Sequence, residues 1–485
     1  MTGILVIDVG TTTLRAAVVD DRLAIVALAT RSSAPSTPFP GLVEFDAVEL
    51  ARLAVDAAAE ATSRADRPIT AVGITNQRAS TVVWDRRTGE PVGPALGWQD
   101  LRTVMECIVA KDAHGLHLAP NQSATKVAWL LDHIEGARDR AEDLCFGTID
   151  SWLAWSLSGG ALHVTDHSNA GVTGLLLPDA SAWSDRALAA LDIPATTMPG
   201  LVSTSGVVGE ATALPGGPAI AALVGDQQGS LVGQGCVRLG QAKITFGSGA
   251  MLDLCRGPDA PESAHRSKHG TYPIIAWSRG GELMWGVEAI MLSAGTNVEW
   301  LREDLGLVDS AAATHDVAAA VETADGVVFV PALLGLGTPH WDYGARGTLV
   351  GVTRGTTAAH VVRAVLEGVA QRGADLVEAA EADTGLTIER LRVDGGMSEN
   401  PTFLQALANA TGRPVEVSPV VDATALGAAF LAGLATGVWG DIDDAEDTWR
   451  PRQVVEPGAA LDRGAWSRAV ERAAGWIPEL SALDF

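Results

Sequence analysis

The chain opens with two short apolar runs separated by a turn, and the same pattern returns in its second half. Residues 3–8 and 15–19 flank the first turn, and residues 241–246 and 250–254 flank a second turn at 247–249. Apolar runs of this length, bounded by small turn residues, predict β-hairpins. Helical stretches follow each hairpin, and then an apolar strand that ends in a polar turn. We therefore expect a duplicated α/β domain, with a mixed sheet flanked by helices in each copy.

The two copies should meet where an apolar strand, a helical turn and a glycine-rich connection precede the second hairpin. This pattern occupies residues 223–240 (LVGDQQGSLVGQGCVRLG), and we place the boundary near residue 235. The prediction is an N-terminal domain over 1–235 and a C-terminal domain over 236–485, with the functional site between them. The Ala/Gly-rich stretch 423–440 is too weakly apolar for a membrane span and predicts a packed interior helix.

Composition and charge narrow the class of protein. The 485 residues are 47% apolar and 19% charged, which is typical of a folded globular protein. A net charge of −25 repels nucleic acid and anionic membranes, so neither is an expected partner. The start of the chain lacks the basic region of a signal peptide. A reduced, cytoplasmic protein without a zinc site is expected, because no C-x-x-C pair occurs among Cys107, Cys145, Cys236 and Cys255.

The turn of the first hairpin has the residues of a phosphate cradle. Main-chain N–H groups and the hydroxyls of Thr11, Thr12 and Thr13 can face phosphate oxygens, and Arg15 supplies local positive charge. Asp8 can hold Mg²⁺ through water. An ordinary hairpin with threonine in its turn remains the alternative. The second turn, with Gly247 and Ser248, has the same chemistry, and two such turns in one cleft favour phosphate binding.

Three further segments carry polar groups at strand ends. The turn 393–400 ends a strand and begins a helix, and it can contact a nucleoside, although a plain glycine turn is the alternative. Asp226 follows an apolar strand and can act as a general base or as a helix N-cap. Arg78 and Trp98 suit a small polyhydroxylated molecule. The alternatives for them are a surface ion pair and a core aromatic residue.

These segments occur in an order that resembles one known family. GITNQR, GWQDLRT, ATKVAWLL, GDQQGSLVGQG, RVDGGMSENPTF and DATALGAA appear as they do in the FGGY carbohydrate kinases, in wording closest to the family's glycerol kinases. The resemblance extends from about residue 3 to about residue 440. It implies an α/β fold of two ribonuclease-H-like domains of the actin and hexokinase type, with an ATP cleft between them.

The resemblance also implies roles for individual residues. Asp226 would take the proton from the substrate hydroxyl, and Asp8 and Asp226 would position Mg²⁺ through ATP and water. The ATP phosphates and nucleoside would lie against Thr11, Thr12, Arg15, Gly247, Ser248, Gly295, Gly396 and Asn400. The substrate pocket would comprise Arg78, Ala79, Trp98, Asn121, Asp226, Gln227 and Met251.

Three of these pocket positions depart from the pattern that the resemblance implies. Ala79 stands where a glutamate is usual, Asn121 where a tyrosine is usual, and Met251 where a phenylalanine is usual. A substrate hydroxyl left without a partner costs roughly 1–3 kcal/mol. We therefore expect a kinase for glycerol or a related small polyol or sugar, with glycerol not the best substrate. A tetritol, pentitol or ketopentose is the alternative acceptor.

Two other classes of protein are weighed against a kinase. One is an actin-fold ATPase that works as a chaperone or sugar-sensing regulator, and the other is an inactive relative that only binds. The expected partners are ATP, Mg²⁺ and a small polyol or sugar. The oligomeric state stays open, with a homodimer and a homotetramer as the candidates.

Overall fold

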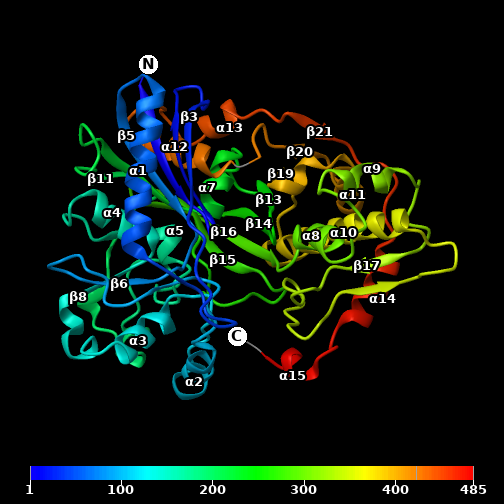
Figure 1. Cartoon of the computed structure of the whole chain (residues 1–485), viewed down its shortest axis with the longest axis horizontal. Helices are drawn as coiled ribbons and strands as arrows, with labels where there is room; N and C mark the ends of the chain where they lie inside the picture. Colours follow the sequence, from blue (N-terminus) through cyan, green and yellow to red (C-terminus); the bar gives the residue numbers. More distant parts are fainter. Residues whose placement is uncertain (1, 422, 484–485) are drawn as a thin grey trace.

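The centre of the molecule is one 13-stranded sheet, ordered β21-β20-β19-β13-β14-β16-β15-β11-β12-β5-β1-β2-β3. The computed structural model describes residues 2–421 and 423–483, so Asp422 of the DATALGAA segment lies outside the described residues. Elements of the first half gather at one end of this sheet and elements of the second half at the other (Figure 1).

The first half combines three antiparallel strands with two parallel ones. These strands are β1 (Gly3–Val9), β2 (Thr13–Val19), β3 (Ile25–Ser32), β5 (Ile69–Asn76) and β12 (Ala219–Gly225). β2 pairs antiparallel with β1 and β3, whereas β5 lies parallel between β1 and β12. All seven residues of β1 are buried, because helices cover both faces of the sheet there. The first hairpin is confirmed, and its second strand begins at Thr13 rather than at residue 15.

The second half repeats this arrangement. Its strands are β13 (Ala242–Phe246), β14 (Ala250–Gly257), β16 (Glu282–Met291), β19 (Leu391–Asp394) and β20 (Val415–Val417). β14 pairs antiparallel with β13 and β16, and β19 lies parallel between β13 and β20. The second hairpin and the duplication of the sheet are thereby confirmed.

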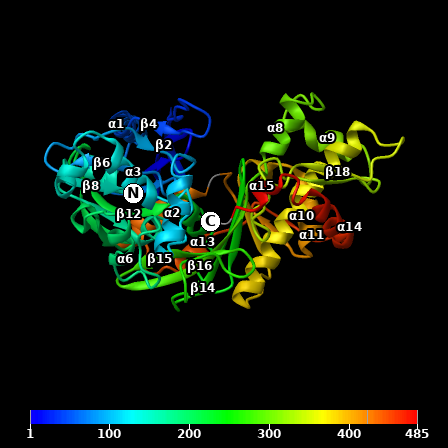
Figure 2. The ribbon, with the colours of Figure 1, turned by 90° about the horizontal axis from the view of Figure 1, so that it is seen from below.

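The two copies of the sheet join edge to edge, which the sequence did not predict. β11 (Ser205–Glu210) extends the first half, and β15 (Tyr272–Arg279) extends the second. They meet through the single pair Ser205 and Arg279. In Figure 2, β14, β15 and β16 stand between the elements of the two halves. A pairing between residues 74 positions apart in sequence leaves no local signal.

Short strands complete the two halves. They are β4 (Glu44–Phe45), β6 (Val82–Asp85), β7 (Ala95–Leu96), β8 (Leu144–Gly147), β9 (Val164–Asp166), β10 (Gly200–Val202), β17 (Val328–Val330), β18 (Thr348–Val350) and β21 (Gln453–Val455).

Helices cover the sheet in both halves. Those of the first half are α1 (Ala47–Ala65), α2 (Val104–His114), α3 (Ala124–His133), α4 (Ile149–Leu157), α5 (His167–Ala170), α6 (Asp185–Ala190) and α7 (Asp226–Gly233). Those of the second half are α8 (Thr296–Glu303), α9 (Ala313–Ala319), α10 (Ala358–Thr384), α11 (Pro401–Thr411), α12 (Thr424–Ala435), α13 (Asp444–Thr448), α14 (Arg463–Ala473) and α15 (Pro478–Ser481). Asp46 caps α1 by accepting a hydrogen bond from Glu49 N. Its buried alanines then face the strands.

The helices α7 and α12 cross at very close range between the halves. A Cβ atom at Gly427 would lie 1.9 Å from the carbonyl oxygen of Gly229, so only glycine permits this approach. α12 comes from the second half but packs on β1, β5 and β12 of the first. Most of its residues are buried, which confirms the predicted interior helix. Within the part of the chain that the structure describes, no helix has the length and apolarity needed to cross a bilayer.

Candidate active site

Three parallel strands of the first half end at the same edge of the sheet. Asp8 of β1 pairs in register with Thr75 of β5, which also pairs with Val224 of β12. The residues that follow β5 and β12 are Gln77 and Asp226, and they therefore emerge beside Asp8. Carboxyl ends of parallel strands are the usual position of a ligand site in open α/β sheets. The structure thus brings together side chains that lie more than 200 residues apart.

Asp226 is the first residue of α7 and faces Arg78. Its Oδ1 accepts a hydrogen bond from Gln227 N at 2.8 Å, and Arg78 Nε lies 3.5 Å from the same oxygen. The N-cap position belongs to Gly225, so the interpretation of Asp226 as an N-cap is wrong. About 29% of its side chain is exposed. Burial raises the pKa of Asp226, and the nearby Arg78 opposes that rise.

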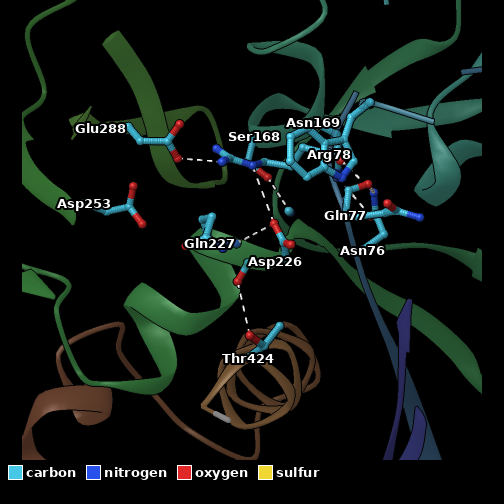
Figure 3. Close-up of polar contacts among 12 residues, drawn as sticks. Asn76, Gln77, Arg78, Ser168, Asn169, Asp226, Gln227, Asp253, Glu288 and Thr424 are labelled. Carbon is cyan, nitrogen blue, oxygen red and sulfur yellow. Dashed lines mark hydrogen bonds and ion pairs between the residues drawn. The ribbon is translucent and has the colours of Figure 1, made fainter. Parts of the chain in front are cut away.

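Arg78 joins the two halves of the molecule through a buried ion pair. Its Nη2 donates to Glu288 Oε2 at 2.5 Å, and both side chains are almost fully buried (Figure 3). Burial alone would lower the pKa of Arg78, but Glu288 and Asp226 raise it overall. Nη1 is buried and has no hydrogen-bond acceptor among the described residues. The interpretation of Arg78 as half of a surface ion pair is therefore wrong.

A row of polar side chains runs across the strands beneath Arg78. In register order, Lys243 pairs with Asp253, Asp253 with Glu288, and Glu288 with Tyr272. Paired residues project to the same face of a sheet, so the four side chains share one face. Lys243 Nζ lies 2.8 Å from Asp253 Oδ2 and donates to Gln227 Oε1 at 2.7 Å. The row thus connects the second-half sheet to the residue beside Asp226.

The acidic members of this cluster outnumber its cations. Asp226, Asp253 and Glu288 are balanced only by Arg78 and Lys243. Burial raises the pKa of Glu288 to about 7, while Arg78 opposes the rise and Asp253 adds to it. Neither oxygen of Asp253 has an aligned hydrogen-bond donor within the described residues. The cluster therefore has spare capacity to accept hydrogen bonds.

The first phosphate turn contacts the predicted substrate wall. Trp98 Nε1 donates to Thr11 Oγ1 at 3.2 Å, so one hydrogen bond joins a predicted phosphate residue to a predicted substrate residue. Trp98 is only partly buried, which does not fit a core aromatic residue. Arg15 Nη1 lies 3.7 Å from Asp8 Oδ2, and Thr12 is exposed in the turn.

The second and third glycine-rich turns lie against each other. Gly295 N donates to Gly247 O at 2.9 Å, and a Cβ at Gly395 would lie 2.4 Å from Phe246 O. Gly247 and Ser248 are exposed, and a Cβ at Gly396 would meet no atom within 4 Å. The structure therefore gathers four predicted nucleotide residues around open space.

Asn400 is occupied by structural hydrogen bonds at the start of α11. Its Oδ1 accepts from Phe403 N, and its Nδ2 donates to Thr314 Oγ1 at 2.8 Å. The cap explains why the helix begins at Pro401.

The three departing pocket positions lie in different surroundings. Ala79 is buried, and its carbonyl accepts a hydrogen bond from Ser123 Oγ at 3.0 Å. Asn121 is exposed in the loop that precedes α3. Met251 is partly buried on β14 and pairs in register with Thr245 and Ile290. Ala79 and the loop of Asn121 are thus joined directly, whereas Met251 belongs to the opposite half.

Lys126 supports the substrate wall from behind. Its Nζ donates to the carbonyl oxygens of Gly97 and Trp98 at 2.8 and 3.1 Å, and the side chain is fully buried. Burial lowers the pKa of Lys126 to about 7. Between that pH and the usual lysine pKa, the unfolded chain binds a proton here that the folded protein does not. Folding is therefore favoured increasingly as the pH rises through this range.

Replacing Lys126 with methionine should remove this pH dependence. Relative to the Lys126→Met variant, the wild-type free energy of unfolding should rise by about 2 kcal/mol between pH 7 and pH 9. Urea denaturation at the two pH values measures the difference. Lys268→Met, at an exposed lysine, is the control. Parallel pH dependence in wild type and Lys126→Met would contradict a buried lysine that loses its proton near neutrality.

Sequence reasoning missed Lys243, Asp253, Glu288 and Tyr272. A single charged residue inside each of the apolar runs AKITF, AMLDL and WGVEAIM was the available signal. Such residues predict a buried ion pair. The sequence did not indicate that they share a row, because the row depends on the register of four strands.

Comparison with known proteins places this geometry among carbohydrate kinases. Residues 3–233 match the N-terminal domain of the FGGY family of carbohydrate kinases, and residues 242–436 match its C-terminal domain. A glycerol kinase of Aromatoleum aromaticum is 43% identical, over 98% of this chain and 100% of its own length.

Two solved structures share the fold. A Plasmodium falciparum glycerol kinase crystallised with ADP has a TM-score of 0.89 at 28% identity, and the match covers 98% of each chain. A ligand-bound xylulose kinase from Lactobacillus acidophilus has a TM-score of 0.85 at 20% identity and covers 99% of each chain, which shows the fold alone. The expected fold of two α/β domains is thereby confirmed.

Proposed function

Because the chain belongs to the FGGY family of carbohydrate kinases, we propose that it transfers the γ-phosphate of ATP to a terminal hydroxyl of glycerol or a related small polyol. The observation that carries the assignment is the pairing of Asp226 with Arg78. A carboxylate and a spare guanidinium N–H, both at the carboxyl ends of parallel strands, suit one hydroxylated carbon chain. Full-length similarity to glycerol kinases supports the same acceptor class.

In the proposed reaction, Asp226 accepts the proton of the attacking hydroxyl. Its raised pKa brings it closer to the working pH than an exposed aspartate would be, which favours general-base catalysis. Arg78 Nη1 would orient a neighbouring hydroxyl, and the Arg78–Glu288 pair would hold the guanidinium in place. Little covalent chemistry is left to the protein in phosphoryl transfer, so positioning and charge compensation dominate.

The ATP phosphates would lie between the two phosphate turns. Thr11, Thr12, Thr13 and Arg15 would contact them from the first half, and Gly247 and Ser248 from the second. The open space around Gly396 supports placement of the nucleoside there, next to Gly295 and the start of α11 at Asn400.

The carboxylates of the cleft fit a magnesium ion of the kind that ATP carries. Mg²⁺ in such sites keeps several waters and takes only one or two carboxylates, the phosphates supplying the remaining oxygens. Asp8 and Asp226 stand at the ends of β1 and β12 and would hold the ion through water. When bound, the ion neutralises phosphate charge.

The division of the chain near residue 235 belongs to the same proposal. The connection between α7 and β13 lies there and is the point at which the duplicated strand order restarts. α12 nevertheless packs on the first-half sheet, so the two units share their helices at the cleft.

Product identification tests the function. Incubation with MgATP and glycerol, or with a tetritol or pentitol, should give a terminal phosphomonoester that ³¹P NMR detects. Transfer to no polyol or ketopentose would overturn the proposal.

Replacing Gly247 with valine should impair the use of ATP. The only atom outside its own neighbours near a Cβ at this position is Gly249 O at 3.8 Å, so the folded protein has room for the side chain. The branched group would instead obstruct the approach of the phosphates. We expect the KM for ATP to rise at least about tenfold, the equivalent of about 1.4 kcal/mol.

Steady-state kinetics and thermal unfolding check this expectation. Gly355→Val is the matched control, because a Cβ there meets only Thr353 Oγ1 at 3.7 Å in an exposed turn. If Gly247→Val folds and keeps the wild-type KM for ATP, the second turn does not face the nucleotide.

A further inference from the structure

We propose that the hollow lined by His117, Gln122, His265, Arg266 and Tyr272 is a second substrate subsite, which receives the distal hydroxyls of an uncharged polyol or sugar longer than glycerol. The inference rests on the proposed kinase function and specifies which acceptor the same site prefers. It assigns specificity to five residues that belong to none of the motifs used above.

The hollow is large enough for part of a substrate. Its volume is about 260 Å³, far above the roughly 15 Å³ that one water needs. One wall comes from the loop between α2 and α3 in the first half, and the other from the segment before β15 in the second half. The rings of His117 and His265 come within 5.1 Å of each other across it. A ligand in the hollow would therefore touch both halves.

The second-half wall continues directly into the Arg78 site. Tyr272 lines the hollow and is the register partner of Glu288, on the same face of the sheet. Glu288 in turn accepts the hydrogen bond from Arg78. One strand spacing, about 4.8 Å, therefore separates the backbone of Tyr272 from that of the residue that holds the catalytic-site guanidinium.

The first-half wall reaches the same place independently. Gln122 Oε1 accepts a hydrogen bond from Ala119 N, which shapes the loop that lines the hollow. The next residue, Ser123, donates to the carbonyl oxygen of Ala79. Ala79 follows Arg78 in sequence. Both walls therefore converge on Arg78, and the small side chain at position 79 lies on the path between the two sites.

The groups around the hollow match hydroxyls better than a carboxylate. Two imidazoles, an amide and a phenol each donate and accept hydrogen bonds, as hydroxyls do. Partial burial, together with His117 and Arg186, lowers the pKa of His265, so this ring is neutral at neutral pH. Arg266 is the only fixed cation in the lining, and its guanidinium already lies over the Trp341 ring at 5.4 Å. The chemistry therefore points to an uncharged polyhydroxylated chain.

The geometry also explains how a longer chain could compensate for Ala79. A three-carbon substrate bound at Asp226 and Arg78 ends before it reaches the hollow. Each further hydroxylated carbon could gain partners from Tyr272, Gln122 and His117. The lost carboxylate at position 79 would then open a passage instead of merely removing a contact.

The test compares acceptors of increasing length in matched variants. In wild type, kcat/KM should rise from glycerol to pentitols or ketopentoses. The His117→Leu and Gln122→Leu variants should lower the ratio of kcat/KM for the best long acceptor to that for glycerol by about tenfold or more. His114→Leu, at an exposed histidine in the same segment, should leave this ratio unchanged. Calorimetric titration with the long acceptor, without ATP, should show the same loss of affinity.

Several outcomes would overturn the subsite. An unchanged ratio and unchanged affinity in both leucine variants would mean that the hollow does not contact the substrate. Equal losses for glycerol and the long acceptor would indicate a structural role only. A polyhydroxy acid preferred over every neutral acceptor, with the preference lost in Arg266→Leu, would replace the hydroxyl interpretation. If no acceptor is phosphorylated but the pentitol still binds and His117→Leu weakens it, the kinase function fails and the subsite stands.

Discussion

Replacing Asp226 with asparagine should lower kcat by about 10²–10⁴-fold for every polyol acceptor. The amide keeps the size of the side chain and can still accept from Gln227 N, but it cannot take the proton of the attacking hydroxyl. ATP should bind nearly as well as in wild type, because the proposed nucleotide contacts come from the two phosphate turns and the start of α11. Stopped-flow or steady-state rates, together with ATP titration, measure the two effects.

A matched control separates this effect from a general change of charge. Asp309→Asn, at an exposed aspartate far along the chain, should leave kcat unchanged. More than about a tenth of the wild-type kcat in Asp226→Asn would show that Asp226 is not the base.

Replacing Arg78 with methionine should damage both stability and turnover. The change leaves Glu288 buried without its cation, and breaking a buried ion pair in this way costs about 3–5 kcal/mol. It also removes the spare Nη1 donor, so we expect kcat/KM for polyols to fall by at least about 100-fold. Urea denaturation and steady-state kinetics measure the two losses separately.

The double variant Arg78→Met with Glu288→Leu separates the two roles. Replacing both partners with apolar groups should restore most of the stability, because no buried charge is left unpaired. Activity should not return, because the donor to the substrate is still missing. Recovery of kcat/KM together with stability would mean that Arg78 acts only as a structural ion pair.

Features encoded in neighbouring residues could be predicted from the sequence. Each hairpin is a local pattern of apolar runs around a small-residue turn, and the helix at 424–435 follows from an uninterrupted Ala/Gly-rich stretch. Asp226 and Arg78 were also identified, because each ends an apolar strand. Their burial and their mutual contact depend on the parallel order of β12, β5 and β1, which the sequence indicates only through the resemblance.

The features that were missed depend on register between distant strands. Lys243, Asp253, Glu288 and Tyr272 form one row only because β13, β14, β16 and β15 align as they do. A shift of one residue in any strand would send its side chain to the other face. The edge-to-edge joining through Ser205 and Arg279 is equally non-local. Such contacts carry no signal in any single stretch of sequence.

The central claim, that ATP is consumed by transfer to a polyol, is tested most directly by measuring ADP formation with and without an acceptor. The protein is incubated with MgATP alone and with MgATP plus glycerol, a pentitol or a ketopentose. The account predicts that ADP forms only when an acceptor is present, in a one-to-one ratio with the phosphorylated acceptor. ADP formation at the same rate without any acceptor would contradict it and would identify the protein as an ATPase.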